Sequence, residues 1–433
     1  MSRLRLGLAA AALALAAALP AQAAGTITVY KSQDPGLELK TYAWEGGKSL
    51  RFTHGVGSAA FRHPQDPPGQ FYGLGDRGPN FACGEVKAVT GLEMEKLCKD
   101  REVRIYPVPD YHPSIYRILL REDGTFSLAG VISLKDRDGR PLTGLPNPLT
   151  AAAAETAVDG RGNPLPPDPG AVDAEGLVRL RDGTFWIGEE NAPSILHAGP
   201  DGRVLKRIVP AGSERDFAGA NYPVEGGLPA ILARRQGNRG IESMALSPDE
   251  RFLYFMLQSP LANPDARAFA RSRNTRILKF DLRAGKVVGQ YVYRLDDPRT
   301  FRKDPSGSPA AIRVSEAHAL GPDRLLVLER TDKTTKLHEA DLRGATDILG
   351  SKWDDPAARP TLEQSDDLAA AGVIPVRKAP RWDSADHPEA PGKLEGMAFL
   401  GDGSLLLIND NDFGIAGEET LVLVLRGHGI RRE

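Results

Sequence analysis

The sequence predicts an all-β fold, a β-propeller of four-stranded blades, from a repeated segment, the spacing of its copies and their turns. Each copy opens with a glutamate, continues as an apolar strand, turns, and closes on acids or amides; the four copies begin at Glu175, Glu242, Glu316 and Glu395. These glutamates lie 67, 74 and 79 residues apart, which is longer than a solenoid repeat. A fifth, degenerate copy runs from His54 to Arg77. Regular repetition at this length favours blades arranged around a central channel.

The turns predict two hairpins in each repeat, and two hairpins make one four-stranded blade. The first hairpins turn at Asp182-Gly183, Pro248-Asp249, Pro322-Asp323 and Asp402-Gly403. Dipeptides such as Asp-Gly between apolar runs are strong hairpin signals. Five repeats are visible, at residues 51–132, 173–210, 240–293, 314–347 and 393–433. We expect six blades, because residues 26–47 hold two more extended stretches that either close the ring or join a sixth blade.

Residues 1–24 are predicted to be a signal peptide. Arg3 and Arg5 precede an apolar run, and Ala21-Gln22-Ala23 provides a cleavage site of small residues. The apolar run is shorter than the ~20 residues that cross a bilayer, which makes a membrane anchor the weaker alternative. Residues 25–433 are then expected to form one propeller domain that is periplasmic or secreted, with no membrane anchor.

The composition of the chain indicates which kinds of partner and which cellular compartment to expect. A net charge of −2 provides no basic surface, so no nucleic-acid partner is expected. Cys83 and Cys98 are expected to form a disulfide in an oxidising compartment, which stabilises the fold by ~3 kcal/mol because it closes a short loop. Residues 142–172, 209–240 and 349–391 lack the repeat pattern and are predicted to be long connections, either lids or surface loops.

The repeat glutamates predict a ring of carboxylates. The inner strands of a propeller run beside the central channel, so equivalent positions converge at one end of it. Carboxylates gathered there repel one another unless a cation, protons or arginines intervene. Ca²⁺ suits such a ring because it takes about six to eight oxygen ligands in a flexible geometry. The expected ligands are the repeat glutamates Glu175, Glu242, Glu316 and Glu395, together with Asp76, Glu190, Asn409 and Asp410.

A structural interpretation of the same glutamates stays open. Each could accept backbone hydrogen bonds from a neighbouring blade, or pair with Arg77, Arg239 or Arg330, and so lock the blades together. The histidines near the repeat starts, His54 and His318, are likewise either a base or ligand, or satisfied structural residues.

The sequence lacks the motifs that several other kinds of catalytic chemistry require. There is no Gly-x-Ser-x-Gly nucleophile elbow and no His-Glu-x-x-His zinc motif. The stretch Gly73 to Gly78 fits a dinucleotide-binding pattern, but Pro79 and Asn80 follow where a helix should begin. We therefore exclude serine-esterase, zinc and dinucleotide chemistry.

Six motifs occur in order along the chain: Gly75-Asp76-Arg77-Gly78, Val172-Asp173-Ala174-Glu175-Gly176-Leu177, Ile187-Gly188-Glu189-Glu190, Asn238-Arg239-Gly240-Ile241-Glu242-Ser243, Lys393-Leu394-Glu395-Gly396-Met397 and Asn409-Asp410-Asn411-Asp412-Phe413-Gly414. In order and spacing they resemble the phytase-like family, described as "esterase-like activity of phytase". The resemblance covers most of residues 25–433 and implies an exported propeller that hydrolyses ester or phosphoester bonds. The chain departs from the family at Gly55-Val56-Gly57-Ser58-Ala59, where many relatives carry a Gly-Leu-Ser-Gly-like turn.

The function we expect is metal-assisted hydrolysis of a small-molecule ester or phosphoester. Ca²⁺ would polarise a phosphoryl or acyl oxygen, arginines would clamp a phosphate, and a free carboxylate would act as general base. The candidate catalytic residues are Glu175, Glu242, Glu316, Glu395, Arg77, Arg239, Arg330 and His318. Two alternatives stay open, a calcium lactonase of the gluconolactonase type and a non-catalytic envelope propeller that binds a partner.

Overall fold

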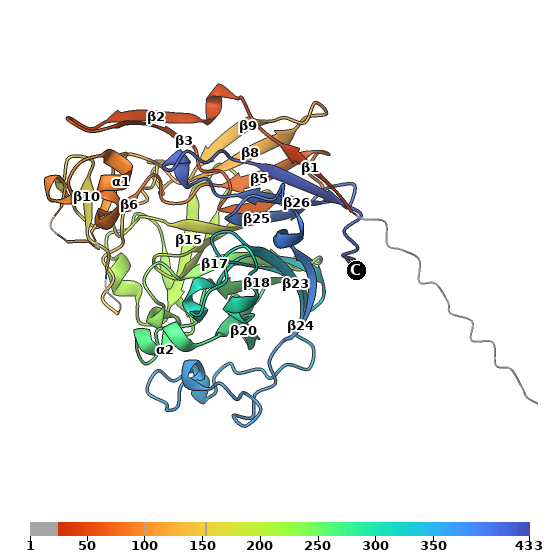
Figure 1. Cartoon of the computed structure of the whole chain (residues 1–433). Helices are drawn as coiled ribbons and strands as arrows, with labels where there is room; N and C mark the ends of the chain where they lie inside the picture. Colours follow the sequence, from red (N-terminus) through yellow and green to blue (C-terminus); the bar gives the residue numbers. More distant parts are fainter. Residues whose placement is uncertain (1–24, 99, 102, 152–153) are drawn as a thin grey trace, which may run out of the picture.

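The computed structural model describes residues 25–98, 100–101, 103–151 and 154–433, so the predicted signal peptide lies outside the described residues (Figure 1). The first strands of five sheets lie beside one another in a closed ring, in which the last strand contacts the first. These inner strands are β4 (Ala59–Phe61), β12 (Ala174–Arg179), β17 (Ile241–Leu246), β21 (Arg313–Gly321) and β25 (Leu394–Phe399). The predicted all-β propeller is confirmed.

Each blade continues outward from its inner strand through antiparallel neighbours. Blade 1 adds β5 (Gln70–Leu74), β8 (Ser114–Leu120) and β9 (Phe126–Ser133). Blade 2 adds β13 (Phe185–Glu189), β14 (Ser194–Ala198), β15 (Val204–Pro210) and a fifth, parallel strand, β16 (Val224–Leu228). Blade 3 adds β18 (Phe252–Leu257), β19 (Asn274–Asp281) and β20 (Lys286–Arg294). Blade 4 adds β22 (Arg324–Arg330), β23 (Thr335–Asp341) and β24 (Arg377–Asp383).

Blade 5 is built from both ends of the chain. Its inner strand β25 is followed by β26 (Leu405–Asn409) and β27 (Val422–Arg426), and the N-terminal β1 (Thr26–Tyr30) pairs with the outer edge of β27. An unpaired edge strand exposes a row of backbone donors and acceptors, which β1 satisfies here. The expectation of six blades is therefore wrong: the described residues form five, because one stretch of residues 26–47 closes the ring. The other stretch, β2 (Glu38–Ala43), pairs with β3 (Ser49–Thr53) and with no other strand of the described residues.

Insertions add a small sheet and short helices outside the blades. The sheet contains β6 (Phe81–Ala82), β7 (Arg104–Tyr106), β10 (Ala157–Asp159) and β11 (Pro164–Leu165). The α-helices are α1 (Val86–Thr90) and α2 (Ala266–Arg271). The 3-10 turns are η1 (Pro35–Leu37), η2 (Cys83–Glu85), η3 (Met94–Lys96), η4 (Glu214–Phe217), η5 (Ala230–Arg234), η6 (Pro298–Thr300), η7 (Pro309–Ala311), η8 (Lys352–Asp354), η9 (Leu362–Gln364), η10 (Ser384–Asp386) and η11 (Asp412–Gly414).

Two expectations about the insertions can be compared with the structure. The disulfide between Cys83 and Cys98 is confirmed, and it encloses η2, α1 and η3. Residues 209–240 and 349–391 are more than connections, because they include β16, the fifth strand of blade 2, and β24, the outer strand of blade 4. Among the described residues, no helix is both long and apolar enough to cross a membrane.

Large apolar side chains fill the spaces between adjacent blades. Tyr72 of blade 1 packs edge-on against Phe185 of blade 2, with ring centroids 5.6 Å apart. Trp186 of blade 2 meets Phe280 of blade 3 at 5.8 Å. Aromatic pairs of this kind add ~0.5–1.5 kcal/mol to the stabilisation from buried area. The rigid ring that results fixes the inner strands, and hence the polar residues at their starts.

Candidate functional site

β-Bulges decide which inner-strand residues occupy equivalent positions. In β12, β17 and β25 the pairing register shifts at Glu175, Glu242 and Glu395, so each glutamate is the extra residue of a bulge. In β21 the corresponding shift falls at Ser315, and Glu316 is the next residue. The expectation that four repeat glutamates are equivalent is therefore corrected: three are, and a serine takes the fourth position.

A second set of polar side chains lies at the ends of the second strands. Glu190, Gln258 and Asp410 directly follow β13, β18 and β26, and Arg330 is the last residue of β22. Asp76 lies two residues beyond the end of β5. Because the second strand runs antiparallel to the first, its end adjoins the start of the inner strand. The two sets therefore meet at one end of the channel, as predicted for Asp76, Glu190 and Asp410.

The two sets line a cavity of about 690 Å³. Ten acidic and six basic side chains contribute to its wall: Asp76, Glu85, Asp173, Glu175, Glu190, Glu242, Asp332, Glu395, Asp410 and Asp412, with Arg77, Arg104, Arg239, Arg313, Arg330 and Lys393. The segment closed by the disulfide supplies part of the remaining wall, through Ala88 and Val89. Acids outnumber bases, so the cavity is suited to a cation.

Two groups of three carboxylates in this cavity share one member. Oxygen atoms of Glu175, Glu242 and Glu395 all lie within 4.8 Å of one another, and so do those of Asp76, Asp173 and Glu175. Asp173 belongs to the second group and was not among the candidate ligands predicted from the sequence. Its signal was its place two residues before Glu175, in a motif already noted for its glutamate.

One arginine and two neutral hydrogen-bond donors contact the group formed by Glu175, Glu242 and Glu395. Gln258 Nε2 and Ser315 Oγ donate to Glu242 at 2.6 and 3.0 Å. Arg330 Nε donates to Ser315 Oγ at 2.8 Å, while its Nη2 contacts Glu395 and lies 3.9 Å from Glu242. Arg330 is thus engaged with acids of two other blades and is not free to clamp a substrate phosphate.

Arg77 has a similar role beside the second group. Its Nη1 donates to Glu155 Oε2 at 2.5 Å, and its Nε lies 3.4 Å from Asp173 Oδ2. Only 4% of the Arg77 side chain is exposed. Arg77 therefore serves as a buried counter-charge for Glu155 and Asp173.

Several carboxylate oxygens in the cavity are buried without a hydrogen-bond partner among the described residues. They are both oxygens of Asp173, Oε2 of Glu175 and Oε1 of Glu190. Burial is the main reason why the pKa values of Asp76, Glu175, Glu190 and Asp410 are raised well above their usual range, and neighbouring carboxylates raise them further. Burial also raises the pKa of Glu395 to about 7, although Arg330 opposes the shift.

Arg239 is the predicted arginine with the most freedom to meet a ligand. Its Nη1 donates to the neutral Gln258 Oε1 at 2.5 Å, and among the described residues it has no acid within ion-pair distance. Burial and the nearby Arg313 lower its pKa to about 10, where it is still charged at neutral pH.

Backbone strain gathers at the same cavity. Asn238, Lys393, Asp412 and Phe413 all line it and have φ between 44° and 56°, a region that residues other than glycine rarely adopt. Strain of this kind costs ~1–3 kcal/mol per residue and is found preferentially at functional sites. Asn238 also has a buried Oδ1 without a hydrogen-bond partner among the described residues.

Three predicted site residues lie outside the cavity lining. Glu316 accepts backbone hydrogen bonds from Ala317 at 3.0 Å and from Ala60 of blade 1 at 3.2 Å, which is the blade-locking role. His318 is buried against Phe61 and Phe399, and burial lowers its pKa to about 3, so it is neutral. Asn409 Oδ1 accepts a hydrogen bond from the backbone of Leu421 at 2.6 Å. The structure gives each of these a structural partner instead of a place in the cavity.

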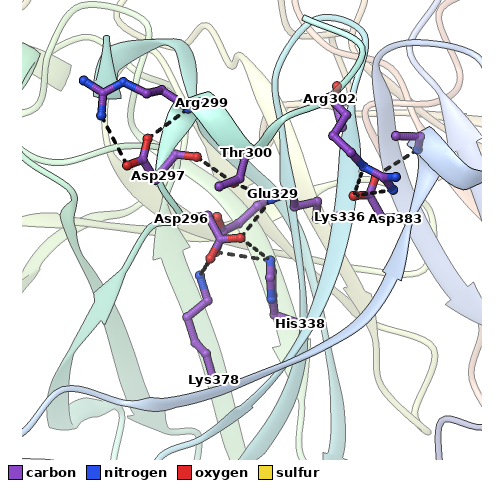
Figure 2. A network of polar contacts seen from close by, with 12 residues as sticks. Asp296, Asp297, Arg299, Thr300, Arg302, Glu329, Lys336, His338, Lys378 and Asp383 are labelled. Carbon is purple, nitrogen blue, oxygen red and sulfur yellow. Dashed lines mark hydrogen bonds and ion pairs between the residues drawn. The ribbon is translucent and has the colours of Figure 1, made fainter. Parts of the chain in front are cut away.

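A further acidic group lies away from the cavity, between blades 3 and 4. Figure 2 shows Lys378 and His338 directed at Asp296, with Lys336 and Glu329 beside them. Lys378 Nζ lies 2.8 Å from Asp296 Oδ1 and also contacts Glu329, and Lys336 Nζ lies 3.1 Å from Asp296 Oδ2. Although burial opposes it, contact with His338 and Lys378 lowers the pKa of Asp296. Two ammonium groups already balance these acids.

The donor set of the cavity fits a hard divalent cation. Carboxylate and amide oxygens line it, whereas the described lining includes no thiolate and no imidazole. Oxygen-only coordination is what Ca²⁺ prefers, while transition metals favour nitrogen and sulfur. The unpartnered carboxylate oxygens are the atoms that such an ion would satisfy.

Comparisons with known proteins give a family and a relative. The family model described as "Phytase-like: Esterase-like activity of phytase" matches residues 84–413. An "uncharacterized secreted protein" of Arthroderma benhamiae is 26% identical over 233 residues, which is 47% of this chain and 45% of that protein. The chain thus spans less than half the length of this relative.

Solved structures resemble the chain only distantly. A calcium-binding protein, regucalcin, from Agrobacterium tumefaciens has a TM-score of 0.34 and 11% identity, covering 88% of this chain and 95% of that one. Hydrazine synthase of Kuenenia stuttgartiensis has a TM-score of 0.31 and 9% identity, covering 85% and 81%. The family model, in contrast, matches well over half of the residues, so this chain belongs to the phytase-like family.

Proposed function

We propose that the protein is an exported hydrolase of small-molecule esters or phosphoesters that uses Ca²⁺ in the propeller cavity. The observation that carries the proposal is the pair of carboxylate groups around Glu175, whose oxygens lie within 4.8 Å of one another in a strained, partly unsatisfied cavity. Family membership supports the ester chemistry, because the family is described by an esterase-like activity. The disulfide and the predicted signal peptide support export.

Different side chains would hold the cation and the substrate. Glu175, Glu242 and Glu395 are the proposed ligands, and Ca²⁺ bound there would polarise a phosphoryl or acyl oxygen. Arg239 would orient an anionic group of the substrate, since its guanidinium is not committed to an acid. A carboxylate of the cavity that the cation leaves free would act as general base.

The alternatives use the same cavity differently. A lactonase would turn over neutral lactones, with neither competition by phosphate nor dependence on Arg239. A binding propeller would turn over no ester at all. Arg239 favours an anionic substrate, because a half-buried guanidinium without an acid partner gains much from an anion.

A calcium titration of residues 25–433 by calorimetry, with thermal unfolding in parallel, tests the proposal. We expect wild type to bind calcium and to unfold at a higher temperature with it, and Glu175→Gln to lose both effects. Glu122→Gln, an exposed acid in a turn, is the matched control and should keep both. Aryl phosphates, carboxylic esters and lactones are then compared as substrates. The proposal fails if wild type neither binds calcium nor cleaves any of them.

A further inference from the structure

We infer that the cavity binds two divalent cations in adjacent subsites that share the carboxylate of Glu175. The glutamate subsite consists of Glu175, Glu242 and Glu395, and the aspartate subsite of Asp76, Asp173 and Glu175. The inference rests on the proposed cation binding and extends it by a second ion and by Asp173 as a ligand.

The spacing of the oxygens fits one cation in each subsite. Ca²⁺ lies ~2.3–2.6 Å from its oxygen ligands, so two oxygens on the same ion are at most ~5 Å apart. In each group of three the oxygens lie within 4.8 Å of one another, and only Glu175 belongs to both groups. A carboxylate has two oxygens with several lone pairs, and can therefore contact two ions at once.

Unpartnered oxygens point independently to a ligand in the aspartate subsite. Asp173 is 3% exposed, and although Arg77 Nε lies 3.4 Å from its Oδ2, neither of its carboxylate oxygens has a hydrogen-bond partner among the described residues. Oε2 of Glu175, the shared residue, is unpartnered as well. Leaving a buried charged acceptor unsatisfied costs ~1–3 kcal/mol or more, and a bound cation removes that cost. The backbone of Asp173 is held in place separately. Its N–H donates a hydrogen bond to Glu189 Oε1 at 3.0 Å.

The charge distribution also favours bound cations at this end of the channel. Six buried acids and the half-buried Asp76 line this end of the channel, and arginines contact three of these seven residues: Asp173, Glu242 and Glu395. The other four have no ion pair within 4.0 Å among the described residues: Asp76, Glu175, Glu190 and Asp410. Two dications would bring four positive charges to these four carboxyl groups, whereas one dication would bring two. Uncompensated charge is costly in a buried site.

A paired-cation site also narrows the substrate class. Two neighbouring cations stabilise both the attacking and the leaving oxygens of a displacement at phosphorus. The cavity would therefore select phosphate esters over neutral lactones, in agreement with the uncommitted guanidinium of Arg239.

The number of ions bound per chain tests the inference directly. Calorimetric titration of residues 25–433 with Ca²⁺ and native mass spectrometry should give two ions for wild type and for Glu122→Gln. Asp173→Asn should remove the aspartate subsite and Glu242→Gln the glutamate subsite, each leaving one ion. Glu175→Gln should weaken both by about 100-fold or more.

Crystals of wild type soaked in Mn²⁺ provide a reading that does not depend on whether a variant folds. Two anomalous peaks, one at each subsite, would support the inference. A single peak, or one ion that Asp173→Asn and Glu242→Gln weaken equally, would overturn it and leave the proposed function standing. Absence of any bound cation would overturn both.

Discussion

Arg330 of blade 4 forms a buried ion pair with Glu395 of blade 5, at the end of the channel where the inner strands begin. The same guanidinium lies 3.9 Å from Glu242 of blade 3, so this one arginine side chain links three consecutive blades. Both partners of the pair are at least nine-tenths buried. The site and the assembly of the ring therefore depend on the same side chain.

Replacing Arg330 should reveal this dependence. Arg330→Ala leaves two buried carboxylates without their counter-charge, and should lower the free energy of unfolding of the metal-free protein by about 3–5 kcal/mol. Urea unfolding in the presence of a chelator measures the loss. Arg299→Ala, which removes an exposed pair with Asp297, should cost less than about 1 kcal/mol. Equal losses in the two variants would contradict a linking role for Arg330.

Calcium should stabilise the native protein through Glu175. At a free concentration about 100-fold above Kd, one bound ion raises the free energy of unfolding by about 2.7 kcal/mol. Glu175→Gln should lose this gain while folding normally in chelator, because an amide in that position no longer repels Glu242 or Asp76. Thermal unfolding with and without calcium distinguishes the two proteins, and an unchanged calcium effect in the variant would exclude Glu175 as a ligand.

Arg239 should govern the binding of an anionic substrate. Arg239→Lys keeps the charge but loses the planar fork, and should raise KM for a phosphate ester about 10-fold or more, with a smaller change in kcat. Competition by inorganic phosphate should weaken in parallel. Arg299→Lys is the control on the surface. If Arg239→Lys has wild-type KM and phosphate inhibition, the guanidinium does not contact the substrate.

The metal-free protein should become less stable as pH rises from about 5 to 8. The pKa of Glu395 is raised to about 7, and burial holds those of Asp76 and Glu175 well above their usual range. The folded state thus keeps protons that the unfolded chain releases near pH 4 to 5. The stability that these protons contribute is complete below the unfolded pKa and is lost as pH rises through the folded pKa.

Urea midpoints measured in chelator across this pH range check the sign. Saturating calcium should flatten the profile at its alkaline end, because the cation replaces the protons as counter-charge. A midpoint that rises with pH in chelator would show that these carboxyl groups are ionised and compensated by other means.

The disulfide should support the cavity wall. Removing it with Cys83→Ser/Cys98→Ser opens a loop of 15 residues, which should cost about 3 kcal/mol by loss of chain-entropy stabilisation. Ala88 and Val89 lie inside this loop and line the cavity, so substrate KM should rise as well. Thermal unfolding and kinetics of the double variant measure the two effects. A lower melting temperature with unchanged KM would separate the loop from the substrate site.

Local features of the chain were sufficient to predict the fold class. Apolar strands and Asp-Gly turns specify hairpins within a few residues, and repetition specifies blades, so the propeller and its inner-strand glutamates could be predicted from the sequence. Disulfide pairing could be predicted because the sequence has two cysteines and is expected to belong to an exported protein. The phytase-like family could also be recognised, because its motifs are contiguous stretches.

The tertiary structure decided everything that depends on contacts between distant residues. The pairing of β1 with β27, from nearly opposite ends of the sequence, shows that there are five blades. No local sequence feature distinguishes a strand that completes an existing blade from one that begins a new blade. The β-bulge in β21 falls at Ser315, so Ser315 takes the position that a glutamate has in β12, β17 and β25. Glu316 is one residue further along and accepts a hydrogen bond from the backbone of blade 1 instead, because a shift of one residue reverses the direction of a strand side chain. Likewise, only the folded arrangement shows that Arg77 and Arg330 are committed to acids, that Arg239 is not, and that Asp173 joins the carboxylates. Whether a buried charge is compensated depends on which side chains lie close to it in space, and the order of residues along the chain does not give those distances.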